Sequence, residues 1–157
     1  MERIMRDSIF ISYSHQDRKF LNELQTMLKS FQRLGTVNVW DDTQIQPGDQ
    51  WREEIQKALA KAKAAVLLVS TNFLASDFIA QNELPPLLEA AKKDGLRVFW
   101  VCLDNCPHEK TEIVDYQAVH DLSKLVSDLK PNQRKAIWKN LCQRLEGLEQ
   151  ARQLHPR

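Results

Sequence analysis

A polar crossing between an apolar run and a helical pattern is the part of this sequence best suited to chemistry. Residues 65–69 are continuously apolar and end at Ser70, which is typical of a strand buried on both faces of a parallel sheet. From about Ser76 the apolar residues follow helical spacing, and this segment carries Glu83. Open α/β sheets bind ligands where a buried strand ends and the chain turns into a helix. Glu83 is therefore the first candidate for a functional residue.

Polar side chains also end the first predicted strand. Tyr13 and Ser14 lie at its end, and Ser70 ends the strand that precedes Glu83. Because the ends of parallel strands meet at one edge of a sheet, we expect these side chains at the same carboxyl edge, where a dinucleotide could lie. The alternative is ordinary strand-end polarity with one aromatic packing contact.

A loop and three aromatic residues are further candidates for ligand contact. Residues 41–49 combine acidic side chains, an isoleucine and a Pro-Gly turn, which suits a lid or an assembly contact more than a buried connector. Trp51 fits a helix core and a platform for a base equally well. Phe73 and Phe78 could stack on a base. The helical spacing of Phe78 with the apolar residues after it favours a core position for that residue.

The sequence argues against a metal site and against a catalytic pair of nucleophile and base. Cys102, Cys106 and His108 form a C-x3-C-x-H pattern that lacks a convincing fourth ligand, so we expect no metal. His15 follows Ser14 directly, and adjacent residues at a strand end usually point in different directions, which argues against a nucleophile and base pair.

These residues must be positioned by alternating strands and helices. Short β-branched, aromatic or continuously apolar runs predict strands, and the segments between them have helical periodicity. We expect strands at residues 8–14, 36–40, 65–69 and 96–103, with a short fifth strand at 116–119. This alternation selects an α/β fold of flavodoxin-like type, a doubly wound parallel sheet of five strands with helices on both faces.

Four helical segments connect or follow the predicted strands. Asp17 is the expected cap of the first helix and Asp49 of the second. The third should begin at about Ser76 and end near Gly95. The last should have Pro131 in its first turn and fray after about residue 149.

Length and composition set further bounds. The 157 residues fit one domain, with a core at about residues 8–148. The 22 basic and 21 acidic residues give a formal charge of +1, which provides no general footprint for nucleic acid or an anionic membrane. The three cysteines suit reduced thiols better than a disulfide framework. With no secretory signal and no apolar run of about 18 residues, we expect a soluble, cytoplasmic protein.

Four motifs in order carry a resemblance to a known family. They are FISYSHQD at residues 10–17, VWDDTQIQPGDQW at 39–51, VLLVSTNFLASDFIAQNEL at 66–84 and VFWVCL at 98–103. Together they resemble the Toll/interleukin-1 receptor (TIR) domain, specifically its bacterial branch, over roughly residues 8–145. The resemblance implies a five-stranded parallel TIR sheet with a mobile loop at residues 41–49.

The resemblance also implies an activity. Many bacterial TIR domains are NAD+ glycohydrolases, which break the bond between nicotinamide and ribose and need a glutamate on the helix after the third strand. Glu83 matches that glutamate, one position later than the spacing in many relatives, where Asn82 would stand. The substrate-binding residues then expected are Tyr13, Ser14, Asp41, Ile45, Gly48, Trp51, Ser70, Phe73 and Ser76.

This reaction needs little catalytic equipment. The nicotinamide leaves as a neutral molecule, so one carboxylate that stabilises the oxocarbenium-like transition state can suffice. The four glycines form no phosphate-binding loop, so NAD+ would be a substrate held in a cleft and not a bound cofactor. The expected product is ADP-ribose or a cyclic form of it, in bacterial defence or effector signalling.

Two alternatives to this enzyme stay open. The chain could be an interaction or adaptor module that works through TIR–TIR contacts, with Glu83 incidental. The enzymatic and the interaction function could combine, because self-association can complete an active site between neighbouring subunits. A sensor domain or an activator protein could control that self-association. A flavodoxin-like receiver is disfavoured, since the first strand does not end in the acidic residues that a receiver needs.

Overall fold

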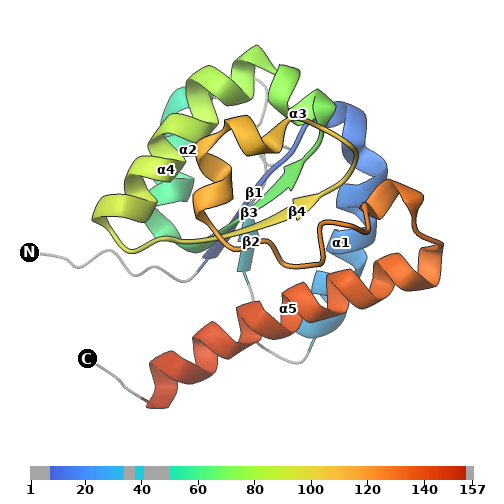
Figure 1. Cartoon of the computed structure of the whole chain (residues 1–157). Helices are drawn as coiled ribbons and strands as arrows, with labels where there is room; N and C mark the ends of the chain where they lie inside the picture. The colour runs from blue at the N-terminus through green and yellow to red at the C-terminus, as the bar shows by residue number, and fades with distance from the viewer. Residues whose placement is uncertain (1–7, 34–37, 41–49, 155–157) are drawn as a thin grey trace, which may run out of the picture.

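The fold is built on a four-stranded parallel sheet. The computed structural model describes residues 8–33, 38–40 and 50–154. Within them the strands lie in the order β2-β1-β3-β4, and every neighbouring pair is parallel (Figure 1). The strands are β1 (Ser8–Ser12), β2 (Asn38–Trp40), β3 (Ala62–Val69) and β4 (Arg97–Cys102). The predicted parallel α/β architecture is confirmed.

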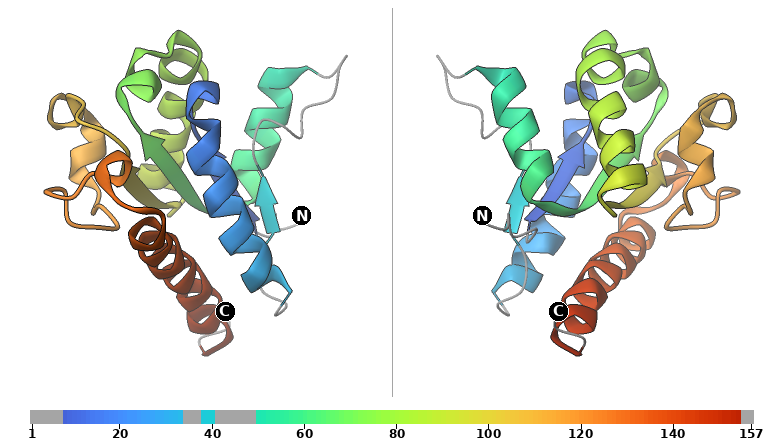
Figure 2. Two further views of the ribbon diagram at one scale, coloured as in Figure 1. Left: turned by 90° about the vertical axis from the view of Figure 1, so that its right-hand side faces the viewer. Right: turned by 90° about the vertical axis from the view of Figure 1, so that its left-hand side faces the viewer.

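Helices cover both faces of the sheet, as predicted. Helices α1 and α5 pack on one face, and α2 and α4 pack on the other (Figure 2). The helices are α1 (Arg18–Gln32), α2 (Trp51–Lys61), α3 (Thr71–Ala75), α4 (Leu84–Lys93) and α5 (Pro131–Leu154). No helix in the described ranges is both long enough and apolar enough to cross a membrane.

The central strand β3 joins the two layers of the core. All of its residues are buried, and alternate side chains enter opposite layers because successive residues of a strand point to opposite faces. Ala64, Val66 and Leu68 pack toward α1 and α5. Ala65, Leu67 and Val69 pack toward α2 and α4. Each fully buried Leu or Val contributes roughly 1.5–3 kcal/mol of hydrophobic stabilisation, which makes β3 the anchor of the fold.

The predicted fifth strand is wrong for the residues that the structure describes. Instead of a strand at residues 116–119, a single parallel bridge joins Ala118 to Trp100 of β4. The next backbone donor along β4, the N–H of Cys102, is taken by Nε2 of the His120 side chain at 2.9 Å. A fifth strand would need that donor to extend its ladder. A side chain therefore ends the pairing after one bridge.

Several helix boundaries differ from the prediction. The third helical segment is found over residues 77–93, but it contains a π-turn (Ile79–Glu83) before α4, and the short helix α3 that precedes it was not predicted. The cap position of α2 is Gln50, while Asp49 falls outside the described residues. Helix α5 begins at Pro131 as predicted but continues to Leu154, past the expected point of fraying. Helix α4 does end near Gly95, whose φ of 75° suits glycine.

Candidate active site

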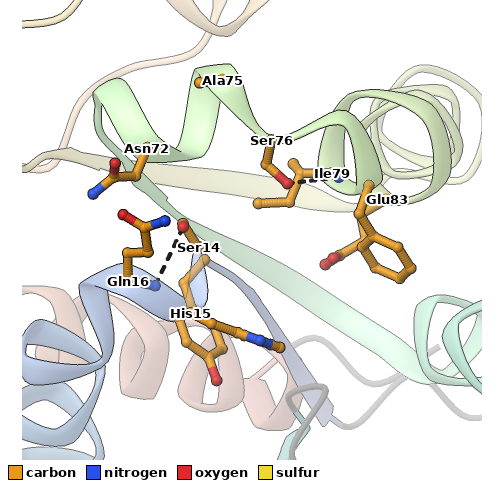
Figure 3. A pocket seen from close by; sticks show the side chains of 10 residues that line it. Ser14, His15, Gln16, Asn72, Ala75, Ser76, Ile79 and Glu83 are labelled. Atoms are coloured by element: carbon orange, nitrogen blue, oxygen red, sulfur yellow. Dashed lines mark hydrogen bonds between the residues drawn. The ribbon is translucent and has the colours of Figure 1, made fainter.

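A cleft lies at the carboxyl edge of the sheet, between the segments that follow β1 and β3. These strands are neighbours, yet the chain leaves β1 for α1 on one face and leaves β3 for α4 on the other. Such a switch point opens a crevice in α/β sheets. The cleft has a volume of about 610 Å³ (Figure 3), and its lining residues are Tyr13, Ser14, His15, Gln16, Asn72, Ala75, Ser76, Phe78, Ile79 and Glu83.

Glu83 provides the carboxylate of this cleft. It is the only acidic residue among the described residues that line it, and its side chain points from the helix into the cleft (Figure 3). Only 2% of Glu83 is exposed. In such a partly desolvated setting, a fixed charge acts on a bound molecule far more strongly than it would in water. The arrangement suits stabilisation of positive charge on a ligand.

A π-turn positions Glu83. The turn spans Ile79–Glu83, and the N–H of Leu84 closes it by donating to the carbonyl of Ile79, five residues earlier. A π-turn holds one more residue than an α-helical turn and occurs often at functional sites. The turn thus contains one residue more than an α-helical turn, and in the sequence Glu83 stands one place later than the motif spacing gives.

Two prolines explain why the helix widens at this point. Pro85 and Pro86 occupy the first turn of α4. In a continuous α-helix their rings would clash with the carbonyls of Gln81 and Asn82, to which they also have no N–H to donate. Starting a new helical segment at Leu84 places both prolines where no intrahelical donor is needed. The Pro-Pro pair was the sequence signal for this interruption.

One wall of the cleft is the turn that follows β1. The backbone N–H of Gln16 donates to Ser14 Oγ at 3.4 Å, and a short 3-10 helix, His15–Asp17, leads into α1. Tyr13 is 2% exposed, and its hydroxyl accepts a hydrogen bond from Arg18 Nη2 at 3.4 Å. The Tyr13 ring also lies against His15, with 5.5 Å between their centroids. Tyr13 is therefore held by packing, whereas Ser14, His15 and Gln16 present polar groups.

The opposite wall is α3 with the turn after it. Ser70 caps α3, since its Oγ accepts from the N–H of Phe73 at 2.9 Å. Thr71 is tied to the end of β4, because its N–H and its Oγ1 both bond to Asp104 Oδ1, at 2.8 and 3.1 Å. Ser76 Oγ accepts from the N–H of Ile79 at 3.2 Å and so connects α3 to the π-turn. These caps give the wall a defined place beside β3.

The predicted site residues are only partly brought together. Tyr13, Ser14, Ser76 and Glu83 line the cleft. Ser70 and Phe73 do not line it, which corrects the expectation that they contact substrate: they are 0% and 1% exposed, because one caps α3 and the other enters the core. Trp51 is the first residue of α2. Asp41, Ile45 and Gly48 lie outside the described residues, as does the rest of the predicted lid.

Among the polar and aromatic residues that line the cleft, three were missed and one was misjudged. His15, Gln16 and Asn72 line the cleft, and the first two could have been expected from their place directly after the first strand. Phe78 lines the cleft with 37% of its surface exposed, so the prediction of a core position is wrong. The helical spacing behind that prediction does not hold, because the π-turn interrupts the helix immediately after Phe78.

The cysteines are not part of this chemistry. All three are buried free thiols, as predicted. Burial raises the pKa of Cys102 and Cys142 to about 12 and also raises that of Cys106, so the reactive thiolate is scarce at neutral pH. Across the described residues, no three His, Cys, Asp or Glu side chains are grouped so that they could hold a metal ion.

Fold and cleft together define the class of this protein. The TIR domain family matches residues 9–142, so the chain belongs to the TIR domain family. The TIR domain of the Toll-related receptor TRR-2 from Hydra magnipapillata has the same fold, with a TM-score of 0.57 at 16% identity. That likeness covers 87% of this chain and 96% of the Hydra domain.

Two bacterial relatives have names that state an activity. Over 127 residues the chain is 28% identical to the NAD(+) hydrolase PdTIR of Paracoccus denitrificans, covering 77% of this chain and 41% of that protein. Over 71 residues it is 31% identical to the 2' cyclic ADP-D-ribose synthase AbTIR of Acinetobacter baumannii, covering 45% of this chain and 25% of that protein. The chain thus spans less than half the length of either relative.

Proposed function

We propose that this TIR domain is an NAD+ nucleosidase in which Glu83 is the catalytic carboxylate. The observation that carries the proposal is a nearly buried glutamate, aimed into the cleft at the switch point of the sheet. Two relatives whose names describe NAD+ hydrolysis and synthesis of a cyclic ADP-ribose support this class of reaction.

The proposed step breaks the bond between C1′ of the ribose and the pyridinium nitrogen of nicotinamide. The bonding electrons return to the ring nitrogen, so nicotinamide leaves uncharged and needs no proton. Positive charge then develops on the ribose, and the Glu83 carboxylate stabilises it while the sugar hydroxyls are held in place. Water adds to C1′ and loses a proton to give ADP-ribose, or a nucleophile within the same molecule adds to give a cyclic product.

The neutral polar groups of the two walls would bind the rest of the substrate. Ser14, Gln16 and Asn72 supply hydroxyl and amide groups in the same cleft as the carboxylate. Phe78 presents an exposed ring, which could stack on a base of the dinucleotide. The cleft thus combines one charge with neutral hydrogen-bonding groups and an aromatic surface, as suits a large substrate with one reacting bond.

Nicotinamide release from NAD+ at high protein concentration tests the proposal. We expect Glu83→Gln to reduce the rate by about 100-fold or more, the scale for loss of a group that stabilises transition-state charge. Glu89→Gln is the matched control, because Glu89 is an exposed glutamate on α4 that pairs with Lys93 at 2.8 Å. Full activity of Glu83→Gln would refute the assignment, and no release by the native protein under any condition would favour the interaction module.

We also infer that self-association activates the enzyme. The rate of nicotinamide release per molecule should then rise with protein concentration and with a crowding agent. A rate per molecule that stays constant down to dilute monomer would exclude this part of the proposal. The same reaction mixtures, separated by chromatography, would report whether linear or cyclic ADP-ribose is formed.

A further inference from the structure

Asp17 is a buried acidic residue that the proposed reaction does not use. It stands at the cap position of α1, where the sequence predicts a side-chain cap, but its carboxylate makes no cap bond to that helix. It is 7% exposed and is not among the residues that line the cleft. Its oxygens face the segment after β3 instead.

Both carboxylate oxygens of Asp17 bind the opposite wall of the cleft. Oδ2 accepts a short hydrogen bond from Ser70 Oγ, and Oδ1 accepts one from Asn72 Nδ2 at 3.3 Å. Ser70 Oγ in turn accepts from the N–H of Phe73 and caps α3. A continuous chain of hydrogen bonds thus runs from the start of α1 to the cap of α3, between residues 53 to 55 positions apart in the sequence.

The chemistry of this contact sets the direction of the Asn72 amide. An ionised carboxylate can only accept hydrogen bonds, so the nitrogen of Asn72 must face Asp17. The amide oxygen is then left as the acceptor that Asn72 offers on the cleft wall. An acceptor that lines the same cleft as Ser14 and Glu83 suits a ribose hydroxyl. Without the carboxylate, the amide could rotate and present its nitrogen instead.

We propose that Asp17 is a positioning residue that orients Asn72 toward the substrate and holds α3 at its place beside the turn after β1. The part of this inference that concerns catalysis rests on the proposed function. Asp17 acts through Asn72, and it does not touch the substrate. Loss of its carboxylate weakens substrate binding by releasing the Asn72 amide.

A double-mutant cycle with Asn72 tests this role. We expect Asp17→Ala to raise the KM for NAD+ about tenfold, the scale of one hydrogen bond. In an Asn72→Ala background, the same change should have a much smaller effect on KM, because only the bond from Ser70 is then left to lose. Asp17→Asn should stay within about threefold of the native KM, since its amide oxygen can accept from Asn72 while its nitrogen donates to Ser70. Additive effects in the cycle would overturn the inference.

A control removes an exposed aspartate whose hydrogen bonds are local and lie away from the cleft. Asp121 Oδ1 accepts from the N–H and Oγ of Ser123, and Asp121 does not line the cleft. Asp121→Ala should leave KM unchanged, and an equal rise in KM for the two variants would overturn the inference. If Asp17→Ala does not fold, Asp17→Ser replaces it, because a serine hydroxyl is too short to reach both partners.

A structural readout separates this inference from the proposed function. In spectra of ¹⁵N-labelled protein, Asp17→Ala should shift the side-chain amide signals of Asn72 and speed hydrogen exchange at the N–H of Phe73. If native protein releases no nicotinamide, the proposed function fails, and these signals alone decide whether Asp17 orients Asn72. Unchanged signals in Asp17→Ala would overturn the inference whatever the activity.

Discussion

Glu23 and Asp17 belong to the same stretch of chain, yet their carboxylates hold different parts of the molecule. Glu23 lies within α1 and binds Arg134 of α5, whose Nε and Nη2 each donate to it at 2.9 Å. Trp138 of α5 donates from Nε1 to the same carboxylate at 3.1 Å. The carboxylate of Asp17, just before α1, instead accepts from neutral side chains below the cleft.

The two carboxylates differ in the kind of donor that they bind, and this difference assigns Glu23 to stability and Asp17 to the cleft. A guanidinium and a carboxylate form two parallel hydrogen bonds in one plane, a strong and specific way to join two helices. The hydrogen bond from Arg134 also holds the pKa of Glu23 below its usual range. Neutral donors bind less strongly but keep a definite direction, which suits a wall that must present an amide to a ligand. We therefore expect changes at Glu23 to affect unfolding and changes around the cleft to affect turnover.

Of the changes considered, deletion of Gln81, which lies next to the cleft, should have the largest effect, and this effect is on the rate of nicotinamide release. Gln81 is an exposed residue of the π-turn, and its removal takes away the one residue by which this turn exceeds an α-helical turn, while Pro85 and Pro86 still interrupt the backbone bonding. Because the core anchors Ile79 at the start of the turn and Leu87 after it, the adjustment falls on Glu83. We expect nicotinamide release to fall about 100-fold, the cost of displacing a catalytic group by about 1 Å.

The control for this deletion is Gln81→Ala, which keeps the length of the turn and should retain full activity. Thermal unfolding of both variants would establish that they are folded. A folded deletion variant with activity close to that of the native protein would show that the π-turn does not set the position of Glu83.

Glu23→Gln should have the next largest effect, on stability. It leaves Arg134, which is 8% exposed, without a charged acceptor, and we expect a loss of about 2 kcal/mol in the free energy of unfolding, measured in urea. Nicotinamide release at 25 °C should stay within about twofold, since 2 kcal/mol leaves a typical domain folded. Glu89→Gln, which removes an exposed pair, should hardly change unfolding. If Glu23→Gln had the same midpoint of urea unfolding as the native protein, the role given to this ion pair would be contradicted.

The smallest predicted effect is a pH dependence of that stability difference. The pKa of Glu23 is lowered from 4.5, chiefly by the hydrogen bond from Arg134, so protons bind more readily to the unfolded chain. The stabilisation is therefore fully present above about pH 4.5 and is lost as the pH falls below it. The gap in unfolding free energy between native protein and Glu23→Gln should shrink in acid. The pKa of His120 is lowered chiefly by burial, but His120 is present in both proteins, so its contribution cancels in the difference between their unfolding free energies. A gap that stays constant into acid would contradict the assignment.

The prediction of the fold from the sequence succeeded where a pattern is local. The apolar run of β3, the glycine after α4 and the proline that begins α5 each lie within or directly beside the element that they define. The fifth strand failed because its outcome depends on a side chain: His120 takes the N–H of Cys102, and no periodicity reports that competition.

The prediction of the site likewise succeeded where the pattern is local and failed where distant contacts decide. The expected place of Glu83 at a cleft is found in the structure, because the end of a buried strand and the following helix mark a cleft in any sheet of this kind. Phe78 was misplaced because helical spacing was extended across a π-turn. Ser70 has the polarity expected at a strand end, but its hydroxyl is used by Asp17 and by the cap of α3.

The sequence by itself determined the alternation of strands and helices, the parallel sheet and the candidate carboxylate, because these follow from hydrophobic period and order along the chain. Only the tertiary structure decided which polar groups face the cleft and which are used up beneath it. The reason is that a hydrogen bond such as the one from Ser70 to Asp17 joins residues 53 positions apart, and nothing local to either residue specifies its partner.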